Sequence, residues 1–156
     1  MKKIVCIFAI ISVPYSFADE CNVDETLVAS CNLSGKVQRS AVFCAKKNNN
    51  TIKYTFKRGD KPELEVDFNP QNKLKRWVDL GTYSTYLGFN KGQYSYVLIV
   101  PEERPNVVAL LEVSRNGEII STKGCDSNSF GKKDIKSNSI EDMLDATIRD
   151  NGFKFP

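Results

Sequence analysis

The 156-residue chain contains no histidine. Without histidine it cannot build a Ser–His–Asp triad, a Cys–His dyad or a histidine-ligated metal centre. Two carboxylates would suffice for a glycosidase, but Glu63, Glu65 and Asp67 alternate along a predicted strand, and we expect them, like Asp79, to face solvent. We therefore expect a protein that is not an enzyme, with no catalytic residues, no metal site and no cofactor.

An excess of charge of one sign is also missing. Lys and Arg number 22 against 19 Asp and Glu, and the two signs are interspersed along the chain. Proteins that bind nucleic acid carry a clustered excess of basic residues. The sequence therefore predicts no nucleic-acid partner.

No apolar run is long enough to cross a membrane. Ile4–Val13 is too short to span about 30 Å of hydrocarbon. It follows the basic start Met1-Lys2-Lys3 and precedes Ser16-Phe17-Ala18, whose small residues suit signal peptidase. We expect residues 1–18 to be a cleaved signal peptide. Residues 19–156 would then form one periplasmic or secreted domain that does not insert into a membrane.

Closely spaced cysteine pairs of the kind that bind zinc are absent. Past the predicted signal peptide the chain has four cysteines, which in an exported protein indicates two disulfides. We favour Cys44 with Cys125 and Cys21 with Cys31, because Cys125 ends the last predicted strand and must be tied back across the fold. The competing arrangement joins Cys31 to Cys44 and Cys21 to Cys125.

The sequence is rich in strand patterns. Segments 36–45, 51–57 and 63–68 alternate apolar and polar residues, and 82–123 has the β-branched and aromatic runs of a meander, with Asn116-Gly117 as a hairpin turn. Tyr83 is placed on one face of its strand together with Thr85, Leu87 and Phe89. The expected fold class is all-β: an antiparallel seven- to eight-stranded barrel or sandwich.

The C-terminal region differs, because Ile140, Met143, Leu144 and Ile148 follow helical spacing. Ser139 and Asp142 resemble a capping box, and Gly152 suits a helix C-terminus. These residues predict a short helix at about 140–150.

Two irregular segments are the candidate partner-binding loops. Asn69–Leu80 holds the only tryptophan, Trp77, beside Lys75 and Arg76, and Trp and Arg are enriched at binding hot spots. The second, Pro101–Pro105, carries Glu103 and Arg104 between two prolines that stiffen it. We predict that these five side chains contact a partner. The alternative for Trp77 is packing at one end of a barrel.

The order of the strands and cysteines gives a family resemblance. A strand ending in Cys44 precedes Thr51–Phe56 and Lys61–Glu65, and later come Phe89–Tyr96 and Cys125. This layout resembles the bacterial periplasmic lysozyme inhibitors and some effector-immunity proteins. The Ser-Gly-x-x-Tyr inhibitory loop of those inhibitors has no counterpart here, so the resemblance assigns no residue.

The resemblance implies a periplasmic, non-enzymatic binding protein. It would be an inhibitor or immunity protein that blocks a secreted or cell-wall-acting enzyme by loop insertion or occlusion. Its partner would be a protein: a toxin, an effector or a cell-wall hydrolase. The alternatives are a small-ligand carrier that uses the barrel interior and a structural surface subunit.

Overall fold

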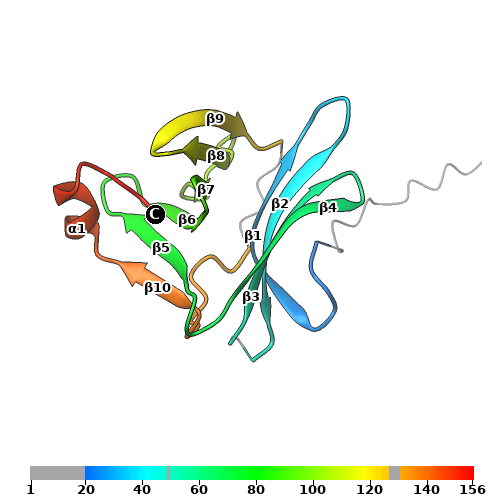
Figure 1. Ribbon diagram of the computed structural model, residues 1–156, viewed down its shortest axis with the longest axis horizontal. Coiled ribbons are helices and arrows are strands. Elements are labelled where there is room, and N and C mark those ends of the chain that lie inside the picture. Colours follow the sequence, from blue (N-terminus) through cyan, green and yellow to red (C-terminus); the bar gives the residue numbers. More distant parts are fainter. Residues whose placement is uncertain (1–19, 49, 127–130) are drawn as a thin grey trace, which may run out of the picture.

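The computed structural model describes residues 20–48, 50–126 and 131–156. Within them ten strands form two sheets that face each other as a sandwich, with one short helix near the C-terminus (Figure 1). The predicted all-β class is confirmed, with more strands than the seven or eight expected and without closure into a barrel. The predicted signal peptide, residues 1–18, lies outside the described residues.

The first sheet consists of four antiparallel strands in sequence order: β1 (Glu25–Leu33), β2 (Arg39–Lys46), β3 (Ile52–Arg58) and β4 (Lys61–Phe68). The alternation expected from the sequence is present. Ile52 and Tyr54 of β3 are buried in the core, while Lys53 lies on the outer face opposite Asp67 of β4. Opposite charges on facing strands stabilise a solvent-exposed face modestly.

The second sheet contains six strands in the order β10-β5-β6-β7-β8-β9. Their bounds are β5 (Leu74–Asp79), β6 (Ser84–Lys91), β7 (Tyr94–Val100), β8 (Leu110–Arg115), β9 (Glu118–Gly124) and β10 (Ile140–Met143). Strands β6 to β9 are the predicted meander. Asn116 and Gly117 join β8 to β9 with φ of 52° and 83°, as the predicted hairpin turn requires.

The segment before the C-terminal helix corrects the sequence prediction. Residues 140–143 form β10, which pairs in parallel with β5, so the helix α1 covers only Asp145–Asp150. The proposed capping box does not form, because the Ser139 hydroxyl donates to the carbonyl of Asn50 at 2.8 Å and Asp142 binds Arg76. The pairing also makes residues 74–79 a strand, so the prediction that 69–80 is irregular was wrong over that part.

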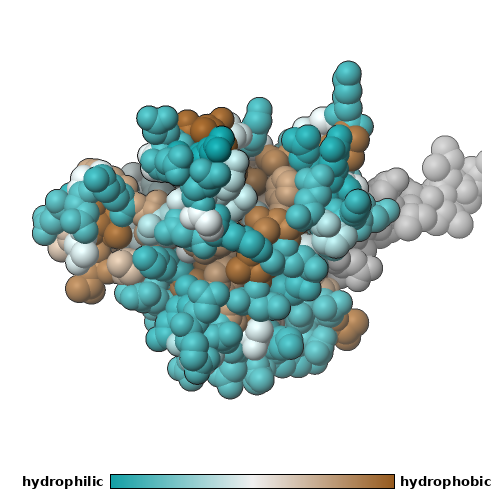
Figure 2. All heavy atoms as spheres, viewed as in Figure 1, coloured by the Kyte–Doolittle hydropathy of each residue, from teal (hydrophilic) through white to brown (hydrophobic). Residues whose placement is uncertain are grey.

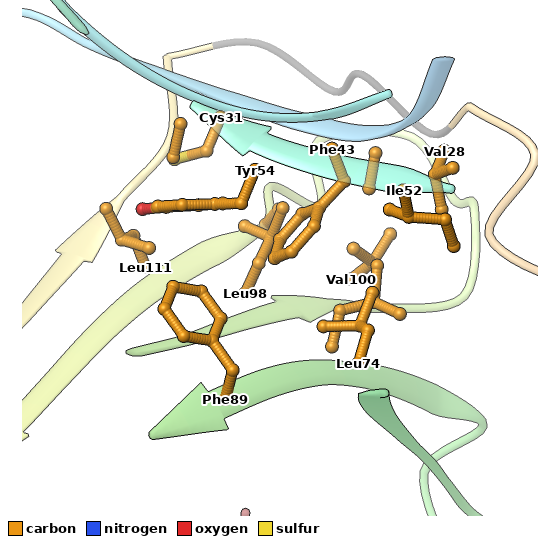
Figure 3. Close-up of a cluster of buried hydrophobic side chains, with 14 of the residues drawn as sticks. Val28, Cys31, Phe43, Ile52, Tyr54, Leu74, Phe89, Leu98, Val100 and Leu111 are labelled. Atoms are coloured by element: carbon orange, nitrogen blue, oxygen red, sulfur yellow. The ribbon is translucent and has the colours of Figure 1, made fainter. Parts of the chain in front are cut away.

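The core fills the space between the sheets (Figure 3). Phe43 and Tyr54 of the first sheet pack with ring centroids 4.8 Å apart, and Phe89 of the second sheet lies 4.9 Å from Tyr54. Leu74, Leu98 and other aliphatic side chains surround the rings. Figure 2 shows a largely hydrophilic outer surface, with hydrophobic side chains visible along the gap between the sheets.

Two disulfides form, as predicted, but the pairing differs from both arrangements considered. Cys21 is bonded to Cys44, and Cys31 to Cys125. The reason is the alternation of β2: Phe43 and Ala45 belong to the core, so Cys44 between them points to the outer face of the first sheet. It therefore meets Cys21 there, while Cys31 and Cys125 meet inside the core.

No helix in the described part of the chain is long and apolar enough to span a membrane. The two disulfides indicate an oxidising compartment, extracellular or periplasmic.

Candidate functional site

The turn that joins β5 to β6 exposes two large apolar side chains. Leu80 is 62% exposed and Tyr83 is 60% exposed. Tyr83 has a φ of 55°, which L-residues rarely adopt outside tight turns. Such strained positions persist only where surrounding contacts hold them, and they are concentrated at functional sites.

The carboxylate of Asp79 holds the turn from inside. Its Oδ1 accepts the Gly81 backbone N–H at 2.9 Å, and its Oδ2 accepts the Thr82 hydroxyl at 2.9 Å. The Asp79 carbonyl accepts the N–H of Tyr83 at 2.7 Å. Arg149 of α1 forms an ion pair with the same carboxylate. These contacts fix the direction in which Leu80 and Tyr83 point.

A second carboxylate, that of Asp145, connects the turn to the C-terminal segment. Its Oδ1 accepts the Trp77 indole N–H at 2.9 Å and the Leu80 backbone N–H at 3.4 Å, and its Oδ2 accepts from Arg149 Nε at 2.8 Å. The hydrogen bond from Arg149, with smaller contributions from Trp77 and Leu80, lowers the pKa of Asp145 below its ordinary value. We call residues 79–84, held by Asp79, Asp145 and Arg149, the clamped turn.

Beside the clamped turn lies a groove of about 590 Å³. Its apolar lining comes from Val78, Leu80, Tyr83, Met143 and Leu144. Val78 and Leu144 are exposed large apolar side chains as well, so the patch extends beyond the turn itself. Exposed apolar patches of this kind, rimmed by polar residues, mark interaction sites.

The structure separates the five residues predicted to contact a partner. Trp77 is 3% exposed and stacks on Tyr86 with ring centroids 4.3 Å apart, and Arg76 is 4% exposed. Trp77 is covered by the C-terminal segment, whereas Arg76, although almost fully buried, lines the floor of the groove. Lys75 is half-buried on β5, and Glu103 and Arg104 are exposed on the 101–105 loop.

Arg76 lies on the inner side of the second sheet, where its guanidinium group is hydrogen-bonded to other parts of the chain. Its Nε and Nη2 donate to the two carboxylate oxygens of Asp142 at 2.5 and 2.9 Å, and its Nη1 donates to the carbonyls of Lys133 and Ile135. The Arg76 hydrogen bond lowers the pKa of Asp142. Arg76 therefore anchors β10 and the segment before it.

The two segments chosen from the sequence do meet in space, and one predicted residue takes part. Arg76, Val78 and Leu80 of the first segment line the groove together with Glu102 of the second. Leu80 ends the first predicted segment but was not among the five residues predicted to contact a partner, and Tyr83 was assigned to a strand face with Thr85, Leu87 and Phe89. The sequence signal for the turn was Asp79 followed by Gly81 and Thr82, since Asp side chains commonly bond the backbone two residues on.

Among the described residues Cys21, Cys44 and Glu25 lie close enough together to suggest metal ligands. Both sulfurs are in the Cys21–Cys44 disulfide and so offer no thiolate to a metal. This cluster is therefore not a metal centre in the disulfide-bonded protein.

Comparison of the chain with protein-family models, with characterised proteins and with solved structures found no match.

Proposed function

We propose that this protein binds another protein through the clamped turn, and that its partner is an exported enzyme whose cleft receives Tyr83 and Leu80. The observation that carries the proposal is the combination of exposure and rigidity: two large apolar side chains point into solvent from a turn held by two carboxylates. Tyrosine is enriched at binding hot spots.

Rigidity favours inhibition because an ordered loop loses little conformational freedom on binding. Immobilising a flexible side chain or loop at an interface costs about 0.5–1.5 kcal/mol for each rotamer-rich side chain. Here the Asp79 and Asp145 hydrogen bonds have already fixed the backbone that carries Leu80 and Tyr83. The adjoining groove offers a second contact area for the rim of the partner's cleft.

The expected partner is a toxin, an effector or a cell-wall hydrolase, and the expected location is the periplasm or the outside of the cell. The oxidising compartment indicated by the two disulfides supports this location. In the proposed mechanism the turn occludes the substrate cleft, so the protein needs no catalytic group of its own.

The first test measures whether the protein inhibits purified muramidases and amidases, with the lysis of peptidoglycan suspensions as the readout. The second test measures whether it protects cells against a toxin encoded beside the gene. We expect Tyr83→Ala to weaken the inhibition constant by about 30-fold, corresponding to about 2 kcal/mol for a hot-spot side chain. The matched control is Ile119→Ala with Ile120→Ala, two equally exposed apolar residues in β9.

Inhibition that survives Tyr83→Ala and Leu80→Ala but is lost in the β9 control would overturn the assignment of the clamped turn. If no such enzyme is inhibited and no toxin is neutralised, the inhibitor proposal itself fails.

The structure supports the two alternatives from the sequence less well. A carrier that holds its ligand deep in the interior needs an empty core, whereas aromatic and aliphatic side chains fill the centre of the sandwich, and the space between the sheets is open at one end as a cleft of about 320 Å³. A structural subunit needs an exchangeable edge strand. The β1 edge already accepts backbone hydrogen bonds, from Asp126 to Asn32 and from Lys132 to Leu27.

A further inference from the structure

The opposite end of the sandwich contains an apolar opening that the proposed function does not use. A cleft of about 320 Å³ lies between the sheets where the β3–β4 hairpin faces β8 and β9. Aromatic and aliphatic side chains from both sheets line it: Tyr54, Phe56, Leu64, Tyr96, Leu111 and Val113. We call this space the mouth cleft. Its volume is at the lower end of the range for small-molecule sites.

The hydroxyl of Tyr54, a lining residue of the mouth cleft, has no hydrogen-bond partner in the described structure. The side chain is 1% exposed, and burial raises the pKa of its phenol well above the ordinary value. Figure 3 shows its oxygen directed toward Leu111, another lining residue. A buried polar group without a partner costs about 1–3 kcal/mol, so a ligand atom that accepts from this hydroxyl would recover that cost.

Positive charge gathers at the rim of the mouth cleft. Arg39 and Lys123 line both this cleft and a neighbouring hollow of about 420 Å³, which Lys36 and Arg58 also line. Two carboxylates lie there as well: Glu63, 3.9 Å from Arg58, lines the cleft, and Asp126 lines the hollow, so the four cations outnumber the two acids. Within the described residues, Lys36, Arg39 and Lys123 form no ion pair.

We propose that the mouth cleft binds a small aromatic anion. The aromatic ring packs among Tyr54, Phe56 and Tyr96, whose rings favour stacked or edge-to-face contacts with another ring. A carboxylate or sulfonate on the ring meets Arg39 and Lys123 at the rim. An oxygen at the far end of the ring accepts a hydrogen bond from Tyr54. This binding is independent of the clamped turn.

The first experiment is calorimetric titration of the full protein with three probes of similar shape: 2-naphthoate, 2-naphthylmethanol and 2-naphthylmethylammonium. We expect saturable one-site binding of 2-naphthoate, weaker binding of the neutral alcohol and weakest binding of the cation. Equal affinity for the cation and the anion would overturn the proposal, as would the absence of saturable binding of 2-naphthoate.

Charge substitutions locate the site. Arg39→Gln and Lys123→Gln are each expected to weaken 2-naphthoate binding by about two- to fivefold, the size of a partly exposed ion pair. The control is Lys47→Gln, because Lys47 is equally exposed and follows the opposite end of β2 from Arg39. Weakening by the control alone, or by none of the three, would contradict the location.

The Tyr54 hydrogen bond has its own test in 6-methoxy-2-naphthoate, which carries an oxygen at the end of the ring opposite the carboxylate. We expect this probe to bind the native protein several-fold more tightly than 2-naphthoate does, and Tyr54→Phe to abolish the difference. Tyr54→Phe also removes an unpaired hydroxyl, so the variant is expected to fold. A preference for the methoxy probe that persists in Tyr54→Phe would show that Tyr54 does not hold the ligand.

Discussion

The outer faces of the two sheets are built differently. The outer face of the first sheet is charged and meets water, with Lys53 forming an ion pair with Glu65 across β3 and β4. The outer face of the second sheet carries Trp77 and Tyr86, and the last residues of the chain cover it (Figure 1). Phe155 packs so closely there that a Cβ on Gly88 would lie 2.6 Å from its ring.

This difference shows how far each sheet depends on the rest of the chain. The strands of the first sheet all come from residues 25–68, and its β1 edge accepts two backbone hydrogen bonds from Asp126 and Lys132. The second sheet depends more heavily on distant residues, with β10 at one edge and residues 153–156 on one face. The clamped turn belongs to the second sheet and takes two of its holding groups, Asp145 and Arg149, from α1. The proposed binding surface therefore depends on the C-terminal segment.

Removing the disulfides one at a time should have the largest effects on the free energy of unfolding. It should also distinguish the bond that ties the two sheets together from the bond that stays with the first sheet. Cys31–Cys125 joins β1 to the end of β9 across 94 residues, and Cys21–Cys44 stays with the first sheet across 23. From loop entropy, replacing each pair by alanine should lower the free energy of unfolding by about 4.7 and 3.4 kcal/mol respectively. Urea unfolding measures both, and a larger loss for the shorter loop would contradict this ranking.

Trp77→Ala should destabilise the protein by about 4 kcal/mol, as large aromatic deletions in packed sites do. The side chain is buried between Tyr86, Phe153 and Phe155, and its N–H binds Asp145. Trp77→Phe keeps most of the ring packing, so it should recover more than half of the loss. Thermal unfolding followed by circular dichroism gives both values, and a loss below 1 kcal/mol for Trp77→Ala would show that the covering segment adds little.

Gly88→Ala should lower stability by about 1–3 kcal/mol through overpacking, because the added methyl would displace Phe155. Gly124→Ala is the matched control, since a Cβ there meets no atom nearer than 3.9 Å. Proton NMR shifts of Phe155 should change in the first variant only. Equal losses of stability for the two substitutions would mean that Phe155 does not pack closely against Gly88.

Lowering the pH should destabilise the second sheet, because two aspartates that hold it become protonated. The pKa values of Asp142 and Asp145 are lowered from 3.8 in the folded protein, mainly by hydrogen bonds from Arg76 and Arg149. Groups with a lowered folded pKa stabilise the fold above their unfolded pKa, and that stability is lost as pH falls through the folded value. We expect the emission of Trp77, the only tryptophan, to shift to longer wavelength below about pH 3.8.

Asp145→Asn should produce part of that emission shift already at neutral pH, because the amide cannot form an ion pair with Arg149. The control Glu141→Gln changes an exposed carboxylate on β10 and should leave the emission unchanged. An unchanged emission spectrum for Asp145→Asn would show that the environment of Trp77 does not depend on the Asp145–Arg149 ion pair that holds the clamped turn.

The smallest effect should come from the outer face of the first sheet. A double-mutant cycle on Lys53 and Glu65 is expected to give a coupling energy below about 1 kcal/mol, because exposed pairs are weak. The same cycle on Arg76 and Asp142 should give a larger value, since that pair is bidentate and the arginine is buried. Equal coupling in the two cycles would remove the contrast between the sheets.

The sequence predicted those strands well that have one face in the core and the other exposed to solvent. The alternation through Ile52, Tyr54 and Phe56 located β3, and Asn116-Gly117 located the β8–β9 hairpin. Strand β5 could not be recognised in this way, because Arg76 is buried on one face and Trp77 on the other, which removes the alternation. Strand β10 is stabilised by pairing with a strand 66 residues earlier, and nothing local to residues 140–143 reveals that pairing.

The clamped turn adjoins the segment in which the sequence predicts partner contacts, but its exposed side chains, Leu80 and Tyr83, are not among the five predicted residues. Trp77 and Arg76 drew attention to residues 69–80, but their chemistry is used to bind the protein's own C-terminal segment. Tyr83 was placed on the inner face with Leu87 and Phe89. Tyr83 instead lies in the turn before β6, with a positive φ and a side chain that is 60% exposed, and no pattern of apolar residues records a backbone angle.

The disulfide connectivity has a consequence for oxidative folding. Among the four described cysteines, taken in sequence order, the first bonds to the third and the second to the fourth, so the two loops interleave. A chain oxidised as it emerges from its N-terminus presents Cys21 and Cys31 together well before Cys125. A bond between Cys21 and Cys31 would occupy one cysteine of each native disulfide, so neither native disulfide could then form. Such a bond would have to be exchanged before the two native disulfides could form.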